Sequence, residues 1–363
     1  MQASLRPAVI LQATAVSGYQ ELLADTANAE YIYPTLFDFL SQRAINIQPE
    51  EAYYQAWRQF RQGQPDQRAA LFTELSYLEY KYAQRPYTKD ILKEQSEALD
   101  SLLQLHRKED FSNEIRIAQV ELLNRYHFSG ISEDSVLTRQ VEICTEGIRL
   151  FPDYARTSSL KNTLSDLQAP SFSMSNNNNV YPGGELKLSI QYKNLSNLTI
   201  RIYKSKRLPT DPIRYETEER EKDLGKLVKQ VTVFLNSREA YLTEDTVITT
   251  TLHTPGLYEC VVTPEKQGFR SQSTFSVSRL ASVSRSIPGK LNSVYVTDYQ
   301  SGRPLDKTAV IGYIYKDRKW LPQDTLYTSG NGIALFDVTK KWTHYRVCAQ
   351  GDTASAITPL TNY

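Results

Sequence analysis

The sequence has few residues that could hold a metal or form disulfide bonds. In 363 residues it contains three cysteines and four histidines. They are widely separated, at Cys144, Cys260, Cys348, His106, His127, His253 and His344. There is no C-x-x-C pair and no H-E-x-x-H pattern, which argues against a zinc or thioredoxin-type redox site. We therefore predict no metal and no cofactor, and packing roles for these side chains, with one bridge between Cys260 and Cys348 left open.

An excess of charge of one sign is also absent. The chain has 42 basic and 41 acidic residues, which gives a formal net charge of +1. Nucleic-acid binding needs a surplus of Lys and Arg on one face, so we predict no nucleic-acid partner. No run of about 18 apolar residues occurs, so no membrane-spanning segment is predicted. Met1 is not followed by a signal-peptide pattern, which leaves a cytosolic protein or an export signal outside this sequence.

The motifs of common catalytic sites are missing as well. We find no G-x-S-x-G nucleophile elbow, no Walker A sequence and no G-x-G-x-x-G fingerprint. The glycine cluster Ser329–Gly332 joins two predicted strands, so it indicates a hairpin turn. The mixed charges of Glu216–Lys222 are typical of solvated surface. Trp320 and Trp342 could stack on sugars or peptides, although core packing is the simpler interpretation. We predict no enzyme activity, no catalytic residue and no defined binding residue.

Glycine is scarce before residue 170, where only four of the 15 glycines lie. This first part, residues 1–169, has apolar residues at helical spacing throughout and is predicted to be all-helical. Thr35 and Asp38 form a T-x-x-D capping box before an apolar run. The most regular stripe comprises Leu137, Val141, Cys144, Ile148 and Phe151. Successive helices with short breaks favour either stacked helical repeats or an irregular bundle.

Strand patterns replace the helical ones after residue 170. Leu186, Leu188 and Ile190 alternate with polar residues, as in a strand with one buried face. Further alternating runs, separated by Gly, Pro and Asn turns, predict two antiparallel immunoglobulin-like β-sandwiches. We place them at residues 170–285 and 286–363. The fold class is thus multidomain α + β.

Four stretches together resemble the bacterial alpha-2-macroglobulin family, of the Bacteroides type. YPTLFDFL at 33–40, followed by Arg43-Ala44, resembles the start of the helical region in that family. YPGGELKLSIQYKNLSNLTIRIYK at 181–204 is similar to its first macroglobulin-like domain, and TPGLYECVV at 254–262 to a later strand of it. The stretch 277–315, with 330–336, resembles the following macroglobulin domain, MG2. The resemblance covers most of the chain.

This resemblance implies an N-terminal piece of a longer endopeptidase inhibitor of the cell envelope or periplasm. In whole members a protease cuts a bait segment and is then trapped, and some members tether it through a Cys-Gly-Glu-Gln thioester. None of the three cysteines stands in that motif, so no thioester is expected in this chain. The implied partners are target endopeptidases, bound through the full-length protein, and downstream macroglobulin domains. Anchoring to a membrane would use a segment outside this sequence.

A second function hypothesis belongs to another class. Helical repeats and immunoglobulin-like modules often bind a peptide, a glycan or an outer-membrane partner through exposed or concave surfaces. A hydrolase is a third and weaker hypothesis, because no two titratable residues are placed at a useful spacing.

Overall fold

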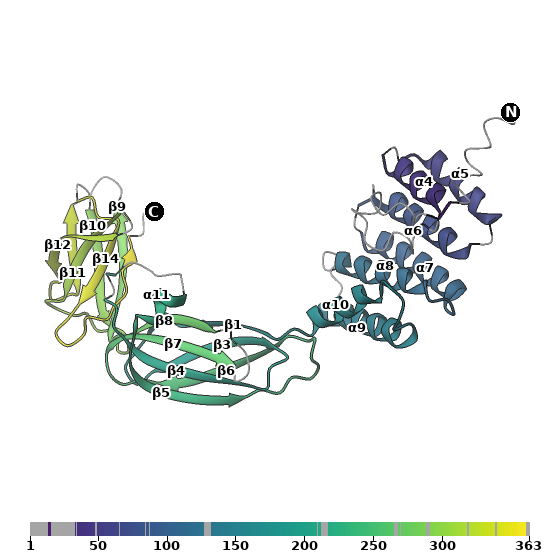
Figure 1. The fold of residues 1–363 in the computed structure, drawn as a ribbon. Helices are drawn as coiled ribbons and strands as arrows, with labels where there is room; N and C mark the ends of the chain where they lie inside the picture. Colours follow the sequence, from purple (N-terminus) through teal and green to yellow (C-terminus); the bar gives the residue numbers. More distant parts are fainter. Residues whose placement is uncertain are drawn as a thin grey trace. The chain divides into compact units, whose positions relative to one another are not determined.

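The structure of the protein is a computed structural model that describes most of the chain. The described residues are 14–15, 33, 35–47, 49–64, 66–83, 85–86, 88–126, 132–208, 210–211, 217–264, 268, 270–287, 291–317, 319–337 and 340–360. The chain divides into two compact units, Met1–Ala169 and Pro170–Tyr363. The first unit is helical and the second is built of strands (Figure 1), which confirms the predicted fold class.

The described part of the helical unit is a series of consecutive helices. They are α4 (Leu36–Ile47), α5 (Glu51–Gln62), α6 (Gln67–Ala83), α7 (Lys89–His106), α8 (Ser112–Arg125), α9 (Glu133–Leu150) and α10 (Thr157–Leu167). From α5 to α10 each helix packs on the next one in the chain, and α8 also contacts α10. Helices that mainly contact their sequence neighbours are typical of stacked repeats. This packing favours the helical-repeat alternative over the irregular bundle.

The capping box predicted at the start of α4 is confirmed. The backbone N–H of Asp38 donates to Thr35 Oγ1 at 3.2 Å, and the N–H of Thr35 donates to Asp38 Oδ2 at 3.2 Å. Two backbone donors at the helix start are thereby satisfied. Asp38 also forms a buried ion pair with Arg61 of α5. The cap therefore fixes both the start of α4 and its contact with α5.

The first β-sandwich faces a three-stranded sheet with a five-stranded one. The first sheet has the order β1 (Ser171–Asn176), β3 (Glu185–Lys193) and β6 (Glu244–Thr251). The second has the order β2 (Asn179–Val180), β8 (Ser271–Val277), β7 (Gly256–Pro264), β4 (Asn197–Ser205) and β5 (Leu224–Phe234). A short helix, α11 (Thr217–Glu221), precedes β5. The described pairings are antiparallel, apart from the short β2 beside β8.

The predicted alternation of buried and exposed residues is confirmed in this sandwich. Leu186, Leu188 and Ile190 of β3 are each at most 1% exposed, and the residues between them are exposed. They pack against Ile200 of β4 and Cys260 of β7 in one apolar core. Strands with one buried and one wet face are expected in such a sandwich.

The second β-sandwich is smaller. One sheet has the order β13 (Ile333–Asp337), β10 (Leu291–Asp298) and β9 (Leu280–Ile287). The other has the order β12 (Lys319–Tyr327), β11 (Ala309–Lys316), β14 (His344–Cys348) and β15 (Thr358–Pro359). Its core is built on Val294, Val296, Val310 and Tyr345. The described pairings here are all antiparallel.

Strand β9 spans the predicted domain boundary at 285/286. It pairs with β10 along its whole length, from Leu280 opposite Asp298 to Ile287 opposite Leu291. The last strand of the first sandwich, β8, ends at Val277. Only Ser278 and Arg279 therefore separate the strands of the two sandwiches. The division into three domains stays a prediction.

Candidate functional site

The helical unit contains a cavity of about 220 Å³ between α6, α7 and α8. Its walls combine leucines with five charged side chains. The described lining residues are Tyr33, Phe72, Leu75, Ser76, Leu78, Glu79, Gln95, Leu99, Glu114, Ile117, Ala118, Glu121, Leu122, Arg125 and Arg156. Small-molecule pockets are usually about 300–1,000 Å³, so this space suits one side chain better than a whole cofactor. We regard it as the candidate functional site of the described chain.

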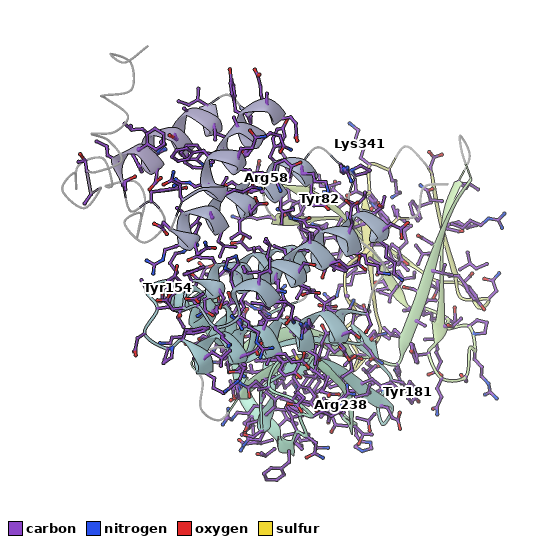
Figure 2. All side chains as sticks on the ribbon, turned by 90° about the vertical axis from the view of Figure 1, so that its right-hand side faces the viewer. Arg58, Tyr82, Tyr154, Tyr181, Arg238 and Lys341 are labelled. Carbon is purple, nitrogen blue, oxygen red and sulfur yellow. The ribbon has the colours of Figure 1, made fainter. Side chains whose placement is uncertain are left out.

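Glu114 lines this cavity and is only 4% exposed. Its Oε2 accepts from Arg156 Nη1 at 2.7 Å, and its Oε1 accepts from the Tyr154 hydroxyl at 2.8 Å. Tyr154, labelled in Figure 2, lies in the segment between α9 and α10. Burial raises the pKa of Glu114, although the charge of Arg156 acts in the opposite direction. This carboxylate is held by residues of the chain itself and has a structural role.

Glu121 lies two turns further along the same face of α8. Loss of surrounding water raises its pKa, and the charge of Glu79 on α6 adds to that rise. Arg156 and Arg125 act in the opposite direction. Neither Glu79 nor Glu121 has a cationic atom within 4 Å among the described residues. Three glutamates and two arginines line the cavity, so its walls carry one negative charge in excess.

The sequence patterns do not single out these glutamates. The apolar residues of α8 form a helical stripe, and the polar residues beside them match no known motif. The informative signal is the seven-residue spacing between Glu114 and Glu121, which places both on one helix face. Their relation to Glu79 and Gln95 depends on how α6 and α7 pack on α8, which the sequence does not reveal.

The described cysteines are free, and Cys144 and Cys260 pack in apolar clusters. Cys144 and Cys260 are both fully buried, and burial raises their pKa values to about 11 and about 12. Burial also raises the pKa of Cys348. The bridge left open between Cys260 and Cys348 is not formed. Thiols with raised pKa values hold little thiolate and are poor nucleophiles at neutral pH.

The described histidines lie apart from one another. His106 contacts the ring of Phe111, and burial lowers its pKa. His344 lies edge-on to Trp320, and burial lowers its pKa as well. His253 lies beside Gly183 in the first sandwich. His127 is outside the described residues.

The two tryptophans considered for ligand stacking are placed differently. Trp342 is 7% exposed and packs against Phe336 and Gly312 in the core of the second sandwich. Trp320 lies between Tyr315 and His344 on the outer face of β12. Ser329–Gly332 forms a tight turn, with the N–H of Gly332 donating to the carbonyl of Ser329 at 2.7 Å. The predicted hairpin is wrong, because the turn joins β12 to β13 and these strands lie in different sheets. Of the run Glu216–Lys222, Thr217–Glu221 forms α11 and Lys222 lies in the turn that follows, whereas Glu216 is outside the described residues.

Two searches of the described residues are negative. No cluster of three or more His, Cys, Asp or Glu side chains is arranged to hold a metal ion. Among the described helices, none has the length and apolar character needed to cross a membrane.

The linker between the two sandwiches is held by a buried aspartate. Asp352, only 1% exposed, follows β14 in the second sandwich. Its Oδ2 accepts from Ser278 Oγ at 3.0 Å and from the backbone N–H of Arg279 at 2.7 Å. Hydrogen bonds to an ionised acceptor are about twice as strong as neutral ones. The two-residue linker is therefore fixed to the second sandwich.

Comparisons with known proteins find structural likeness only. No protein-family model and no curated protein sequence matches the chain. Among solved structures, the chain is similar to native alpha-2-macroglobulin from Escherichia coli spanning domains MG0-NIE-MG1. The identity is 13% and the TM-score 0.42, over 53% of this chain and 64% of that one. This chain thus spans less than two thirds of that structure.

Two further solved structures show the range of the likeness. Salmonella alpha-2-macroglobulin is 12% identical with a TM-score of 0.39, over 53% of this chain and 12% of that one, in its methylamine-reacted form. A CARDB domain from Pyrococcus furiosus, solved with di-metal ions, is 16% identical with a TM-score of 0.19. It covers 30% of this chain and 90% of that one. The β-sandwich assignment for this chain rests on its own strand order and buried faces.

Proposed function

We propose that the chain is a non-catalytic N-terminal scaffold segment of an alpha-2-macroglobulin-like endopeptidase inhibitor. The observation that carries the proposal is the serial arrangement of two β-sandwiches through the linker Ser278–Arg279, which Asp352 holds. A protease trap needs modules joined through short, fixed connections, so that cleavage in one place moves the others. The sequence resemblance to the Bacteroides type of this family supports the same role.

In this role the chain performs no chemistry of its own. Cys144 and Cys260 are buried, Cys348 is half-buried, and the pKa values of all three are raised, which suits packing and not thioester formation. Target endopeptidases would be bound by the full-length protein, with downstream macroglobulin domains as covalent neighbours. The location would be the cell envelope or periplasm, with any membrane anchor outside this sequence.

The proposal is tested on the longest polypeptide encoded by the reading frame that contains this chain. Chymotrypsin is mixed with that polypeptide, or with the 363-residue chain, and assayed on azocasein and on a small fluorogenic peptide. A trap blocks access of the large substrate and spares the small one. We expect this pattern for the long polypeptide and no inhibition by the 363-residue chain.

Other outcomes would overturn the scaffold role. If the reading frame encodes no further β-sandwiches after Tyr363, the chain is not a segment of such an inhibitor. Turnover of either substrate by the 363-residue chain alone, lost on changing a single histidine, shows an enzyme instead. A stable non-protease partner recovered from envelope extract, with no protease complex, favours the second function, a peptide-, glycan- or outer-membrane-binding module.

A further inference from the structure

Gln95 is a buried amide that the fold itself leaves unused. It lies on α7, lines the cavity, and is 8% exposed. Among the described residues its side chain makes no hydrogen bond, and its amide atoms are open to the cavity, because they are not among the fully buried unpaired polar atoms. An amide that faces a cavity and pairs with no residue of the chain keeps its donors and its acceptor available to a ligand.

The chemistry of an amide narrows the choice of that partner. A glutamine side chain offers two N–H donors and one carbonyl acceptor. A peptide group presents the complementary pair, one acceptor and one donor. A partner with only one of these functions would leave half of the Gln95 amide unpaired. Main-chain peptide is therefore the best match for this position.

The charge beside the cavity favours a cation on the same ligand. Glu79 and Glu121 both line the cavity and have no cationic atom within 4 Å among the described side chains. Glu114 is already neutralised by Arg156 at 2.7 Å, and Arg125 offsets part of the remaining charge. Three carboxylates and two arginines line the cavity, so one further ammonium or guanidinium group balances the charge of its walls.

The apolar walls complete the site. Leu75, Leu99 and Leu122 line the cavity together with the charged residues. Lysine and arginine carry a long apolar stem that packs on such surface while the charged end stays in a polar environment. The volume of about 220 Å³ admits a side chain of this kind and not a folded element.

We propose that this cavity binds a lysine or arginine residue of a peptide segment. The side-chain cation pairs with Glu79 and Glu121, the stem lies along the leucines, and the adjoining peptide group pairs with Gln95. This activity is independent of the scaffold role, because the cavity lies within the helical unit and uses no residue of the sandwiches.

The proposal is tested by calorimetric titration of the full 363-residue chain with three probes. Acetyl-Ala-Arg-Ala-amide carries both the cation and peptide groups. Acetyl-Ala-norleucine-Ala-amide lacks the cation, and butylguanidinium lacks the peptide. We expect saturable binding of the arginine peptide, with each of the other probes at least about 10-fold weaker, a loss of about 1.4 kcal/mol. Equal affinity for the norleucine peptide or for butylguanidinium, or no saturation with the arginine peptide up to 10 mM, overturns the proposal.

Matched variants locate the binding. The double variant E79Q/E121Q removes the charges of both carboxylates. It is expected to weaken binding of the arginine peptide at least about 10-fold. E97Q makes the same chemical change at an exposed position of α7 and is expected to leave binding within about twofold, in line with the small effect of exposed charges. If E97Q weakens binding as much as E79Q/E121Q, the effect is one of net charge and the site is wrong.

The variant Q95L separates the role of the amide from packing. Leucine has a similar volume and needs no partner, so Q95L is expected to retain or raise the melting temperature. Q95L should weaken binding of the arginine peptide about fivefold and leave the affinity for butylguanidinium unchanged. Q95M provides the same test if Q95L does not fold. A clear fall in melting temperature for both variants shows that Gln95 is already paired, and overturns the proposal.

Discussion

Ser278 donates a hydrogen bond to Asp352 at 3.0 Å, and both side chains are buried. Asp352 accepts a second bond from the backbone of Arg279 at 2.7 Å. Ser278 and Arg279 are the two residues that separate β8 from β9. One carboxylate of the second sandwich therefore binds both linker residues.

We predict that D352A destabilises the second sandwich by about 2–3 kcal/mol, since the two linker donors lose a charged acceptor. For a domain of this size each kcal/mol corresponds to about 4–8 °C in the melting temperature, measurable by calorimetry. D306A is the control, because Asp306 is an exposed aspartate in the same sandwich. Equal melting temperatures for D352A and the unchanged chain would contradict the assigned role of Asp352.

Gly312 provides a second prediction, about packing. A Cβ atom added at this position would lie 1.9 Å from two ring atoms of Trp342. Neither the indole nor the strand backbone can move that far without disrupting the core. G312A is expected to cost about 3 kcal/mol, at the upper end for overpacked cores, as measured by urea denaturation.

Two variants control this prediction. G330A adds the same methyl group where no atom lies within 4 Å, and should change stability by less than about 0.5 kcal/mol. The double variant G312A/W342L removes the clash and should be more stable than the sum of the single changes. Strict additivity of the two changes would show that the contact with Trp342 is not the cause.

The sequence predicted well the strands that have one solvent-exposed face, because the alternation of apolar and polar residues is a local property. Leu186, Leu188 and Ile190 are buried as predicted. The capping box at Thr35 and Asp38 was also predicted correctly, because all its atoms lie within four residues. Local patterns of this kind contain the information needed for the prediction.

The predicted buried stripe of α9 was shifted from the observed one. The sequence favoured Leu137, Val141, Cys144 and Ile148, whereas the structure buries Val136, Gln140, Ile143, Cys144 and Gly147. Gly147 is buried because Leu160 and Asn113 approach so closely that a Cβ atom would lie 2.6 Å and 2.8 Å from them. Gln140 is buried because its amide donates to Val120 and Asn124 of α8. A glycine and a glutamine do not look apolar in sequence, so contacts with other helices decide this face.

The cavity was unpredictable for the same reason. It brings together Glu79, Gln95 and Glu121 from three helices. None of these residues is unusual within its own helix. Their significance lies in which of them lack a partner, and that depends on tertiary packing.

The buried ion pair of Arg61 with Asp38 gives a third prediction. Both side chains are less than 10% exposed. We predict that R61M costs about 3–5 kcal/mol, because it leaves the Asp38 charge buried without compensation. The double variant R61M/D38N removes the charge, keeps a capping acceptor for Thr35, and should recover most of that loss. The stability of R61M and of R61M/D38N is measured by the loss of the helical circular dichroism signal on heating.

An exposed pair on α9 is the control for this prediction. Arg139 and Glu142 lie 3.0 Å apart and are both more than half exposed. R139M should therefore change stability by less than about 1 kcal/mol. If R61M lowers stability no more than R139M does, the buried ion pair does not contribute to the stability of the fold.

Glu121 gives a prediction of pH dependence with a definite sign. Its pKa is raised above the usual 4.5 by loss of surrounding water and by Glu79. The folded state then binds more protons than the unfolded state between the two pKa values, so the stability contributed by this group falls as pH rises through that window. The E121Q variant has no ionisable group at this position, so it does not lose stability as pH rises through this window. Its melting temperature should match that of the unchanged chain near pH 4 and exceed it near pH 8, followed by helical circular dichroism. E97Q should show no such divergence, and an advantage of E121Q that grows toward acid would mean that the pKa of Glu121 is lowered instead.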